Sequence, residues 1–377
     1  MRLACGRTGV LAIGLLAVVL CFLALHFRGL LFPAVRKSSR SHQPTPPAKK
    51  NDSVIEGDNM TIVMVTCENG LELTLTNLKS ILAFSRASFR LILYADVKNI
   101  NDLQVRIMNF PDNILKRLKY DLRLVMFPKK YFQEWKRLFA PCATQRLFLP
   151  DMLPKEEAVL YLDADILLLR PVEDLWRVFH SMGPSHLIAQ SYEIEDMDTN
   201  PYRHYGSVPY VKPYGVNAGV MPMNLTRMRN FAWGSRMEPL LEQYGSRLKW
   251  ADQDIVNVIF NENPDKLFLM PCTWNFRRDN CEFHESCKGE VPGLLHANQR
   301  LFIKDDEPAL RAAQLAMREY QLGTSLERNF IVPFEERLTM IGNRTLCARR
   351  FLGYMKEWKA LARQLDKERG LSLDLSR

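Results

Sequence analysis

The chain has 377 residues, of which 47% are hydrophobic, which is enough for a large core and for more than one domain. Its formal net charge of +9 would suggest a nucleic-acid partner if it were spread over the folded part. Residues 1–50, however, contain eight Lys or Arg residues and no acid, so the rest of the chain is nearly neutral. We therefore expect no nucleic-acid partner.

The N-terminal segment is typical of an uncleaved signal-anchor. Residues 9–25 carry no charge, and apolar residues extend the stretch to position 32, close to the roughly 20 residues that span a bilayer. A cleaved signal peptide has a shorter apolar region and a small-residue cleavage site, and no good site follows here. We predict a cytosolic tail at 1–8, a transmembrane segment at 9–32, a lumenal stem at 33–58 and a lumenal catalytic domain at 59–377.

Two further patterns bear on the orientation of this segment. More basic residues follow it than precede it, which by itself favours the opposite orientation. Four glycosylation sequons favour a lumenal body, at Asn51, Asn59, Asn224 and Asn343. We therefore predict a single-pass type II protein of the endoplasmic reticulum or Golgi membrane.

Cysteine usage agrees with an oxidising compartment. Six cysteines follow the anchor, an even number that permits disulfides: Cys67, Cys142, Cys272, Cys281, Cys287 and Cys347. Cys281 and Cys287 are the predicted local pair, because they flank a short polar loop. A zinc site is disfavoured, because the chain has no Cys-x-x-Cys.

Strand and helix patterns alternate from about residue 59 onward. Short apolar runs typical of buried strands occupy residues 62–65, 89–95, 122–127 and 159–162. Helical spacing occurs at 71–84, in a region ending near 119, and at 143–152. This alternation predicts an α/β fold with a mostly parallel sheet flanked by helices. Two amphipathic segments, 307–321 and 346–365, are predicted to pack against the edge of the sheet.

Two carboxylates follow the central strand of this pattern. Val159–Leu162 is an apolar run that ends at Asp163 and Asp165. Side chains alternate across a strand, so both acids should point the same way, at the strand end where α/β sheets bind ligands. A hard divalent cation would relieve their repulsion. The alternative is a pair of acids that cap the next helix or face water.

Three later motifs each allow two interpretations. In GVNAGVM (215–221), the glycines suit either close approach to a ligand or a plain turn. In WADQD (250–254), Asp252 or Asp254 is either functional or the N-cap of the following helix. In LLHAN (294–298), His296 alone is more often structural than a ligand.

The ordered set resembles glycosyltransferase family 8. The Asp163-Ala164-Asp165 strand, GVNAGVMPMN, WADQD and LHANQ occur in that family's order. WKRLFAPCATQRLFLP (135–150) and PCTWNFR (271–277) narrow the likeness to its glucoside xylosyltransferases. The resemblance covers about Thr61 to Arg311.

The resemblance implies a GT-A fold and roles for individual residues. It implies that Asp163, Asp165 and His296 hold Mn²⁺ or another divalent cation. The implied donor site for UDP-xylose comprises Thr66, Cys67, Glu68, Arg146, Asp163, Asp165, Asn217 and Gly219. Asp252 would bind sugar hydroxyls, and Gln253 would stabilise the cationic anomeric centre as a catalytic residue.

The implied activity is retaining transfer of xylose to O-linked glucose, in α-1,3 linkage, on EGF-like repeats of Notch-type proteins. The alternatives are a xyloside xylosyltransferase, a family member with another UDP-sugar, and an inactive glycan-binding or chaperone protein. One departure concerns a lysine that many members place on the diphosphate after the metal histidine. This chain lacks it, and Arg300 or Lys304 are the candidates to replace it.

Overall fold

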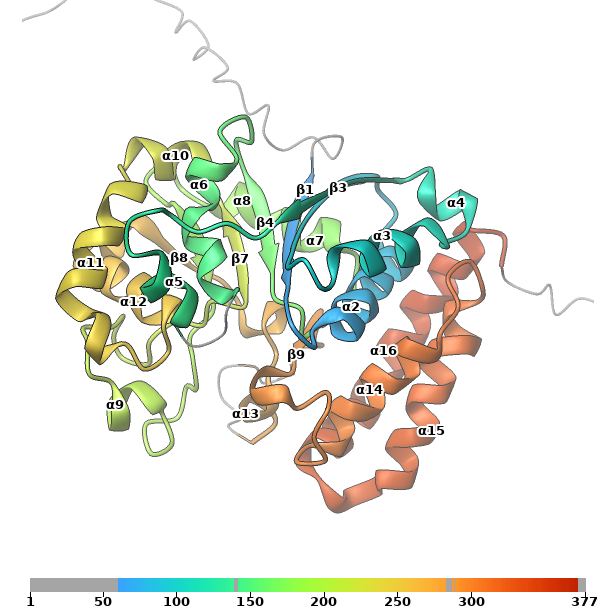
Figure 1. Cartoon of the computed structure of the whole chain (residues 1–377). Helices are drawn as coiled ribbons and strands as arrows, with labels where there is room; N and C mark the ends of the chain where they lie inside the picture. The colour runs from blue at the N-terminus through green and yellow to red at the C-terminus, as the bar shows by residue number, and fades with distance from the viewer. Residues whose placement is uncertain (1–59, 139–141, 283–286, 288, 372–377) are drawn as a thin grey trace, which may run out of the picture. The chain divides into compact units, whose positions relative to one another are not determined.

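A computed structural model describes residues 60–138, 142–282, 287 and 289–371 (Figure 1). The predicted tail, anchor and stem, with the sequons Asn51 and Asn59, lie outside the described residues. Within the described residues, no helix combines the length and apolarity that a membrane crossing requires.

The described chain is built on a seven-stranded mixed sheet in the order β3-β2-β1-β4-β7-β6-β8. Its strands are β1 (Thr61–Thr66), β2 (Phe89–Ala95), β3 (Leu118–Leu124), β4 (Val159–Leu162), β6 (Ile188–Gln190), β7 (Val220–Met223) and β8 (Leu267–Leu269). Only β7 runs antiparallel to its neighbours, β4 and β6. The other neighbouring pairs are parallel, so the predicted mostly parallel sheet is confirmed.

Alternate residues of the central strands enter two separate cores. In β1, Ile62 and Met64 belong to one core, whereas Val63 and Val65 belong to the other. All four are buried. A strand covered on both faces needs an apolar side chain at every position, which explains its unbroken apolar sequence.

Helices cover both faces of the sheet. The α-helices are α2 (Leu71–Phe84), α3 (Ile100–Met108), α4 (Asp112–Leu115), α5 (Phe132–Arg137), α6 (Leu149–Met152), α7 (Val172–Trp176), α8 (Val178–Ser181), α9 (Pro201–Tyr205), α10 (Leu225–Asn230), α11 (Met237–Tyr244), α12 (Asp252–Glu262), α13 (Arg278–Glu282), α14 (Pro308–Glu319), α15 (Val332–Ile341) and α16 (Leu346–Glu368). Figure 1 shows α10, α11 and α12 grouped on one side and α14, α15 and α16 grouped beside α2 on the other.

Of the C-terminal helices, α14 packs on α2, and α15 and α16 pack on α14 and on each other, rather than on the sheet edge as predicted. Phe84 of α2 meets the ring of Phe330 at 6.0 Å between centroids, and Lys79 Nζ donates to the carbonyl of Arg318 at 2.7 Å. The edge strand β3 stays half-exposed. The amphipathic pattern reveals that a helix has a buried face, but it does not reveal which surface covers that face.

Two predicted boundaries also differ. The edge strand β3 covers Leu118–Leu124 rather than 122–127, because its pairing with β2 runs from Phe89 opposite Leu118 to Ala95 opposite Leu124. The predicted helix at 143–152 is a 3₁₀ helix, η3 (Ala143–Phe148), followed by the short α6. Pro150 at the start of α6 lacks the N–H group that a continuous helix would use.

The described residues form three disulfides, and the predicted Cys281–Cys287 pair is wrong. Cys281 bonds to Cys347 at the start of α16, and Cys287 bonds to Cys272. The third disulfide joins Cys67 to Cys142. Closeness in sequence favours a pair only when the chain is unfolded, whereas the fold brings residues 66 positions apart together.

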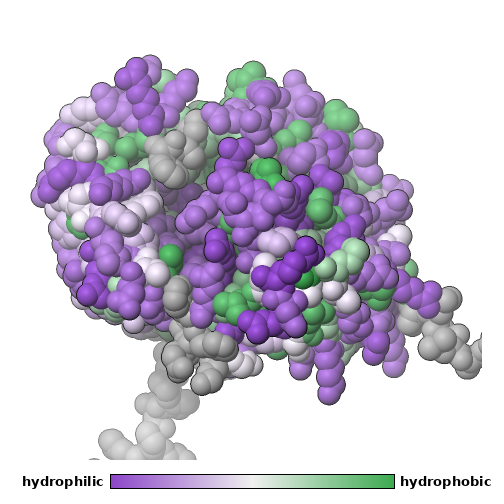
Figure 2. Space-filling view, turned by 90° about the horizontal axis from the view of Figure 1, so that it is seen from below, coloured by the Kyte–Doolittle hydropathy of each residue, from purple (hydrophilic) through white to green (hydrophobic). Residues whose placement is uncertain are grey.

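The surface seen from below the view of Figure 1 is mainly hydrophilic (Figure 2). Apart from the residues drawn in grey, apolar residues appear there singly or in small groups. Scattered exposed apolar residues are normal on soluble domains and need no partner.

Candidate active site

A carboxylate–carboxylate–imidazole cluster forms beyond the end of β4. Asp163, Asp165 and His296 each present one potential ligand atom, and these atoms lie within 4.8 Å of one another. His296 Nε2 is 3.5 Å from Asp165 Oδ1. Two carboxylates and an imidazole form a donor set that suits Mn²⁺. The three predicted ligands therefore fit one cation, whose binding stays a prediction.

A small second sheet brings the histidine to the two acids. β5 (Ile166–Leu168) directly follows Asp165 and pairs antiparallel with β9 (Leu294–His296), placing Ile166 opposite His296. The carbonyl of Asp165 also accepts from the N–H of Ala297 at 3.0 Å. This pairing joins segments about 130 residues apart in the sequence, so no local sequence pattern predicts it.

Gly219 provides the space that the His296 ring occupies. A Cβ atom at position 219 would lie 2.3 Å from His296 Cε1 and 2.9 Å from each ring nitrogen. The carbonyl of Gly219 accepts from the N–H of Asp163 at 2.9 Å. Glycine is therefore needed here for close approach, and the implied contact of Gly219 with a donor sugar stays a prediction.

Arg146 joins the metal-site acids to the predicted catalytic segment. Its guanidinium pairs with Asp163 (Nη2 to Oδ1, 2.8 Å) and with Asp252 (Nε to Oδ2, 2.9 Å). It also donates to the carbonyl of Ala218 and lies over the ring of Tyr161, 4.6 Å from its centroid. Arg146 is 6% exposed, and a planar fork of donors suits such a two-carboxylate bridge.

The acids of the site differ in their electrostatics. Burial raises the pKa of Asp163 above its ordinary value, although Arg146 opposes this effect. Burial acts the same way on Asp165, but His296, a backbone hydrogen bond and Arg146 together hold the pKa of Asp165 below its ordinary value. Burial also raises the pKa of Asp252 against the effect of Arg146. Such perturbed carboxylates in one place are typical of functional sites.

The start of α12 corrects one alternative from the sequence. Ala251, with φ +49°, is the N-cap of α12, and no side chain caps the helix there. Asp252 instead contacts Arg146. Asp254 accepts from the backbone N–H groups of Lys249 and Trp250. Neither acid is therefore a plain N-cap, because both side chains are engaged elsewhere.

Gln253 and Asn217 lie in a buried polar network. Gln253 Oε1 accepts from the N–H of Ala218 at 3.1 Å, and Asn217 Oδ1 accepts from the N–H of Gly219 at 2.9 Å. Both side-chain amides donate to the carboxylate of Glu193. Glu193 could not be recognised from the sequence, because it lies among several acids in a stretch without a distinguishing pattern.

A second missed residue, Asn275, completes this network. Asn275 Nδ2 donates to Asn217 Oδ1 at 2.9 Å, and its Oδ1 lies 2.8 Å from His296 Nδ1. Asn275 belongs to the PCTWNFR segment that carries part of the family resemblance, and only that resemblance indicated a possible role for it. The network links the predicted metal ligand to the predicted catalytic glutamine.

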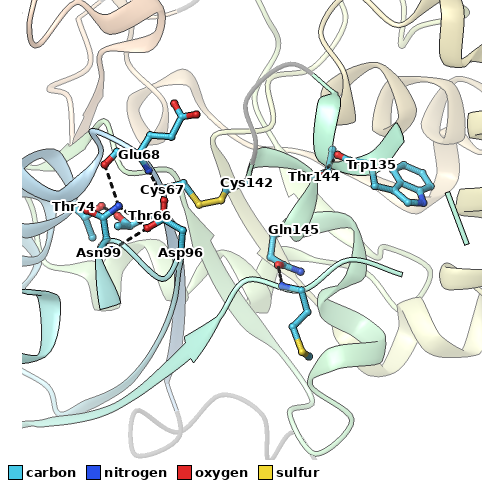
Figure 3. The surroundings of a disulfide bond; sticks show 11 residues. Thr66, Cys67, Glu68, Thr74, Asp96, Asn99, Trp135, Cys142, Thr144 and Gln145 are labelled. Carbon is cyan, nitrogen blue, oxygen red and sulfur yellow. Dashed lines mark hydrogen bonds between the residues drawn. A yellow bond between two sulfur atoms is a disulfide. The ribbon is translucent and has the colours of Figure 1, made fainter. Parts of the chain in front are cut away.

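The loop after β1 holds the residues predicted to lie near the uridine. Figure 3 shows Cys67 bonded to Cys142, with Glu68, Asp96 and Asn99 close to Cys67. The N–H of Glu68 donates to Asp96 Oδ2 at 2.7 Å, and the hydroxyl of Thr66 contacts that of Thr74.

Cys142 immediately precedes η3, the element that carries Arg146. The disulfide therefore ties the loop after β1 to the segment that bridges the acids. The implied contact of this loop with a nucleotide stays a prediction.

Four further predicted residues take no part in the contacts described above. Asn224 caps α10, with its side chain accepting from the N–H of Arg227, and Asn343 is exposed in a short 3₁₀ segment. Their glycosylation stays a prediction. Arg300 and Lys304 are exposed after β9, so their proposed part in phosphate binding also stays a prediction.

The fold and the site define an α/β protein that has an acidic cluster with a histidine beyond the end of a central strand. The family model "Glycosyl transferase family 8" matches residues 61–296. The chain belongs to glycosyltransferase family 8.

Named relatives agree with this assignment. The chain is similar to glucoside xylosyltransferase 1 of Mus musculus, with 35% identity over 80% of this chain and 77% of the relative. The chain is also similar to glucoside xylosyltransferase 2 of Xenopus laevis, with 33% identity over 83% of this chain and 77% of the relative.

Among solved structures, the galactosyltransferase LgtC with donor and acceptor sugar analogues matches with a TM-score of 0.52 and 18% identity. This match covers 64% of this chain and 88% of that one. At this identity, the likeness supports the GT-A-like fold alone.

Proposed function

We propose that this protein transfers xylose from UDP-xylose to glucose O-linked to EGF-like repeats, forming an α-1,3 linkage with retention. The similarity to proteins named glucoside xylosyltransferases carries the proposal for donor and acceptor sugar. The arrangement of Asp163, Asp165 and His296 carries the proposal of Mn²⁺ dependence. Notch-type receptors are the proposed source of the acceptor repeats.

The site residues suit this reaction. A bound cation would supply Lewis-acid stabilisation for the diphosphate that leaves. Asp163 and Asp165 would hold it, with Arg146 compensating the charge of Asp163 at 2.8 Å. Gln253 Oε1 uses one lone pair on the N–H of Ala218, and its second lone pair would face the cationic anomeric carbon.

We also propose that the catalytic unit is lumenal, anchored by residues 9–32 in the endoplasmic reticulum or Golgi membrane. The three disulfides of the described residues support an oxidising compartment. Deglycosylation of the expressed protein followed by mass analysis tests the sequons, because only lumenal sites receive N-glycans.

The test of the activity is sugar transfer by the purified full-length protein with Mn²⁺, an O-glucosylated EGF repeat and a panel of UDP-sugars. We expect transfer from UDP-xylose, lost on chelation and in the Asp163→Asn/Asp165→Asn variant. Transfer only from UDP-glucose or UDP-galactose would replace the donor. Transfer to a xylosylated acceptor alone would indicate a xyloside xylosyltransferase. Binding of the glycopeptide without transfer from any donor would indicate a glycan-binding protein.

A further inference from the structure

Glu193 is a buried carboxylate for which the proposed mechanism has no role. It lies three residues after β6 and is 5% exposed. Its Oε2 accepts from Asn217 Nδ2 at 2.9 Å and from Gln253 Nε2 at 3.1 Å. Glu193 Oε2 thus holds both Asn217, which also bonds to the N–H of Gly219, and Gln253, the predicted catalytic residue. Burying a carboxylate is costly unless its contacts compensate.

The charge of Glu193 has a specific partner. Arg277 Nε lies 3.6 Å from Glu193 Oε1, and Arg277 is 1% exposed. The guanidinium is held in turn by Asp279 and by the carbonyl of Tyr192, each at 3.1 Å. A buried ion pair of this kind is weak evidence for a stabilising role, which leaves positioning of the site as the reason to examine.

A chain of hydrogen bonds from Glu193 to His296 fixes which atom donates and which accepts at each step. An ionised carboxylate only accepts, so Asn217 must turn its NH₂ group toward Glu193. Asn217 Oδ1 then accepts from Asn275 Nδ2, and Asn275 turns its oxygen to His296 Nδ1, 2.8 Å away. The amide oxygen of Asn275 only accepts, so Nδ1 of His296 carries the proton. Its Nε2, 3.5 Å from Asp165 Oδ1, is then the ring nitrogen that would offer a lone pair to a bound cation.

The same logic applies to Gln253. Its Nε2 donates to Glu193, and its Oε1 accepts from the N–H of Ala218. Without the carboxylate, Nε2 would lose this acceptor, while Oε1 would keep the N–H of Ala218. A long amide side chain with fewer fixed contacts samples more rotamers, which would reduce the time its oxygen spends in one place.

We propose that Glu193 is a positioning residue that holds Gln253 and, through Asn217 and Asn275, the imidazole of His296 in their working orientations. In this proposal Glu193 acts through these side chains and not on the reacting atoms. The inference rests on the proposed function, because it gives Gln253 and His296 the roles described above. It predicts that one residue couples metal binding to catalysis.

Double-mutant cycles on the full-length protein test this coupling. The first cycle measures Mn²⁺ affinity from the electron paramagnetic resonance signal of free Mn²⁺ in Glu193→Ala, Asn275→Ala and the double variant. We expect each single substitution to weaken Mn²⁺ binding by about 10-fold. The double variant should bind Mn²⁺ no more than about twofold more weakly than the single variant with the lower affinity. This cycle needs no sugar transfer, so it decides the proposal even if the proposed activity fails.

The second cycle measures transfer with Glu193→Ala, Gln253→Ala and the double variant. Glu193→Ala should lower kcat by about 10-fold or more with a change in donor KM below about threefold, and it should have little further effect once Gln253 is absent. A merely structural role would instead multiply the two losses. Unchanged Mn²⁺ affinity in the first cycle would by itself overturn the proposal, and multiplied losses in kcat would overturn its part that concerns Gln253.

Two further variants keep the result interpretable. Asp196→Ala removes a nearby carboxylate that accepts two hydrogen bonds from Thr199 at the surface, and it should stay within about twofold of wild type in both measurements. If Glu193→Ala does not fold, Glu193→Gln replaces it in both cycles. The amide oxygen can accept from Asn217 and Gln253 in place of Oε2, but the NH₂ group then faces the guanidinium of Arg277. We therefore expect the same losses at reduced size, and wild-type values would overturn the proposal.

Discussion

Replacing Gly219 with alanine is the sharpest single perturbation of the site. The added Cβ would lie 2.3 Å from His296 Cε1, whereas carbon atoms in contact prefer about 3.5–4.0 Å. The ring must therefore move by roughly 1 Å or more. A shift of this size disrupts the 2.8 Å contact between His296 Nδ1 and Asn275 Oδ1, since hydrogen bonds weaken steeply as they lengthen.

Two measurements quantify the effect of Gly219→Ala. We expect Mn²⁺ affinity to fall by about 10- to 100-fold, the range typical of displaced support for a metal ligand. Overpacking should also cost about 1–3 kcal/mol of unfolding free energy, which corresponds to roughly 1–2 °C in Tm for each kcal/mol in a domain of this size. Electron paramagnetic resonance and calorimetry measure the two quantities.

Gly353→Ala is the matched control. Gly353 lies inside α16, and a Cβ there would meet no atom within 4 Å. Alanine should therefore stabilise the helix by about 0.5–1 kcal/mol without affecting Mn²⁺ binding. The reasoning would be refuted if Gly219→Ala kept wild-type affinity and Tm, because the ring would then have room that the packing does not provide.

Three further predictions follow from single contacts. Burial lowers the pKa of Lys79 from 10.5 to about 8, so the unfolded chain binds more protons between these values, and unfolding free energy should rise with pH from about 8 to 10.5. Lys79→Met should lack this rise, and denaturant titrations at pH 8 and 10 on both proteins measure the difference. Arg146→Lys should lower kcat/KM by about 10-fold or more, because one ammonium cannot reproduce a two-carboxylate bridge; near-normal kcat/KM would contradict it. Cys281→Ser/Cys347→Ser should cost about 2–5 kcal/mol, and non-reducing peptide mapping of wild type should recover the Cys281–Cys347 peptide; a Cys281–Cys287 peptide would instead restore the local pairing.

Periodicity was sufficient to predict the architecture. Strands buried on both faces need an apolar residue at every position, so runs such as Ile62–Val65 are visible without any structure. The acids Asp163 and Asp165 were visible for a related reason, because a polar pair that follows such a run marks the end of a strand. Exposed elements were harder, and β3 was misplaced because an edge strand carries no continuous apolar run.

The contacts that complete the site depend on tertiary structure. His296 reaches the acids through the β5–β9 pairing, Arg146 reaches Asp252 across about a hundred residues, and Glu193 reaches Gln253 from the loop after β6. Local sequence specifies which residues can form a strand, a helix or a turn. It does not specify which distant side chain hydrogen-bonds to a buried carboxylate or amide, because that depends on how the elements pack. For this reason the sequence by itself determined the sheet and the acidic strand end, whereas the disulfides and the Glu193 network were decided by the tertiary structure alone.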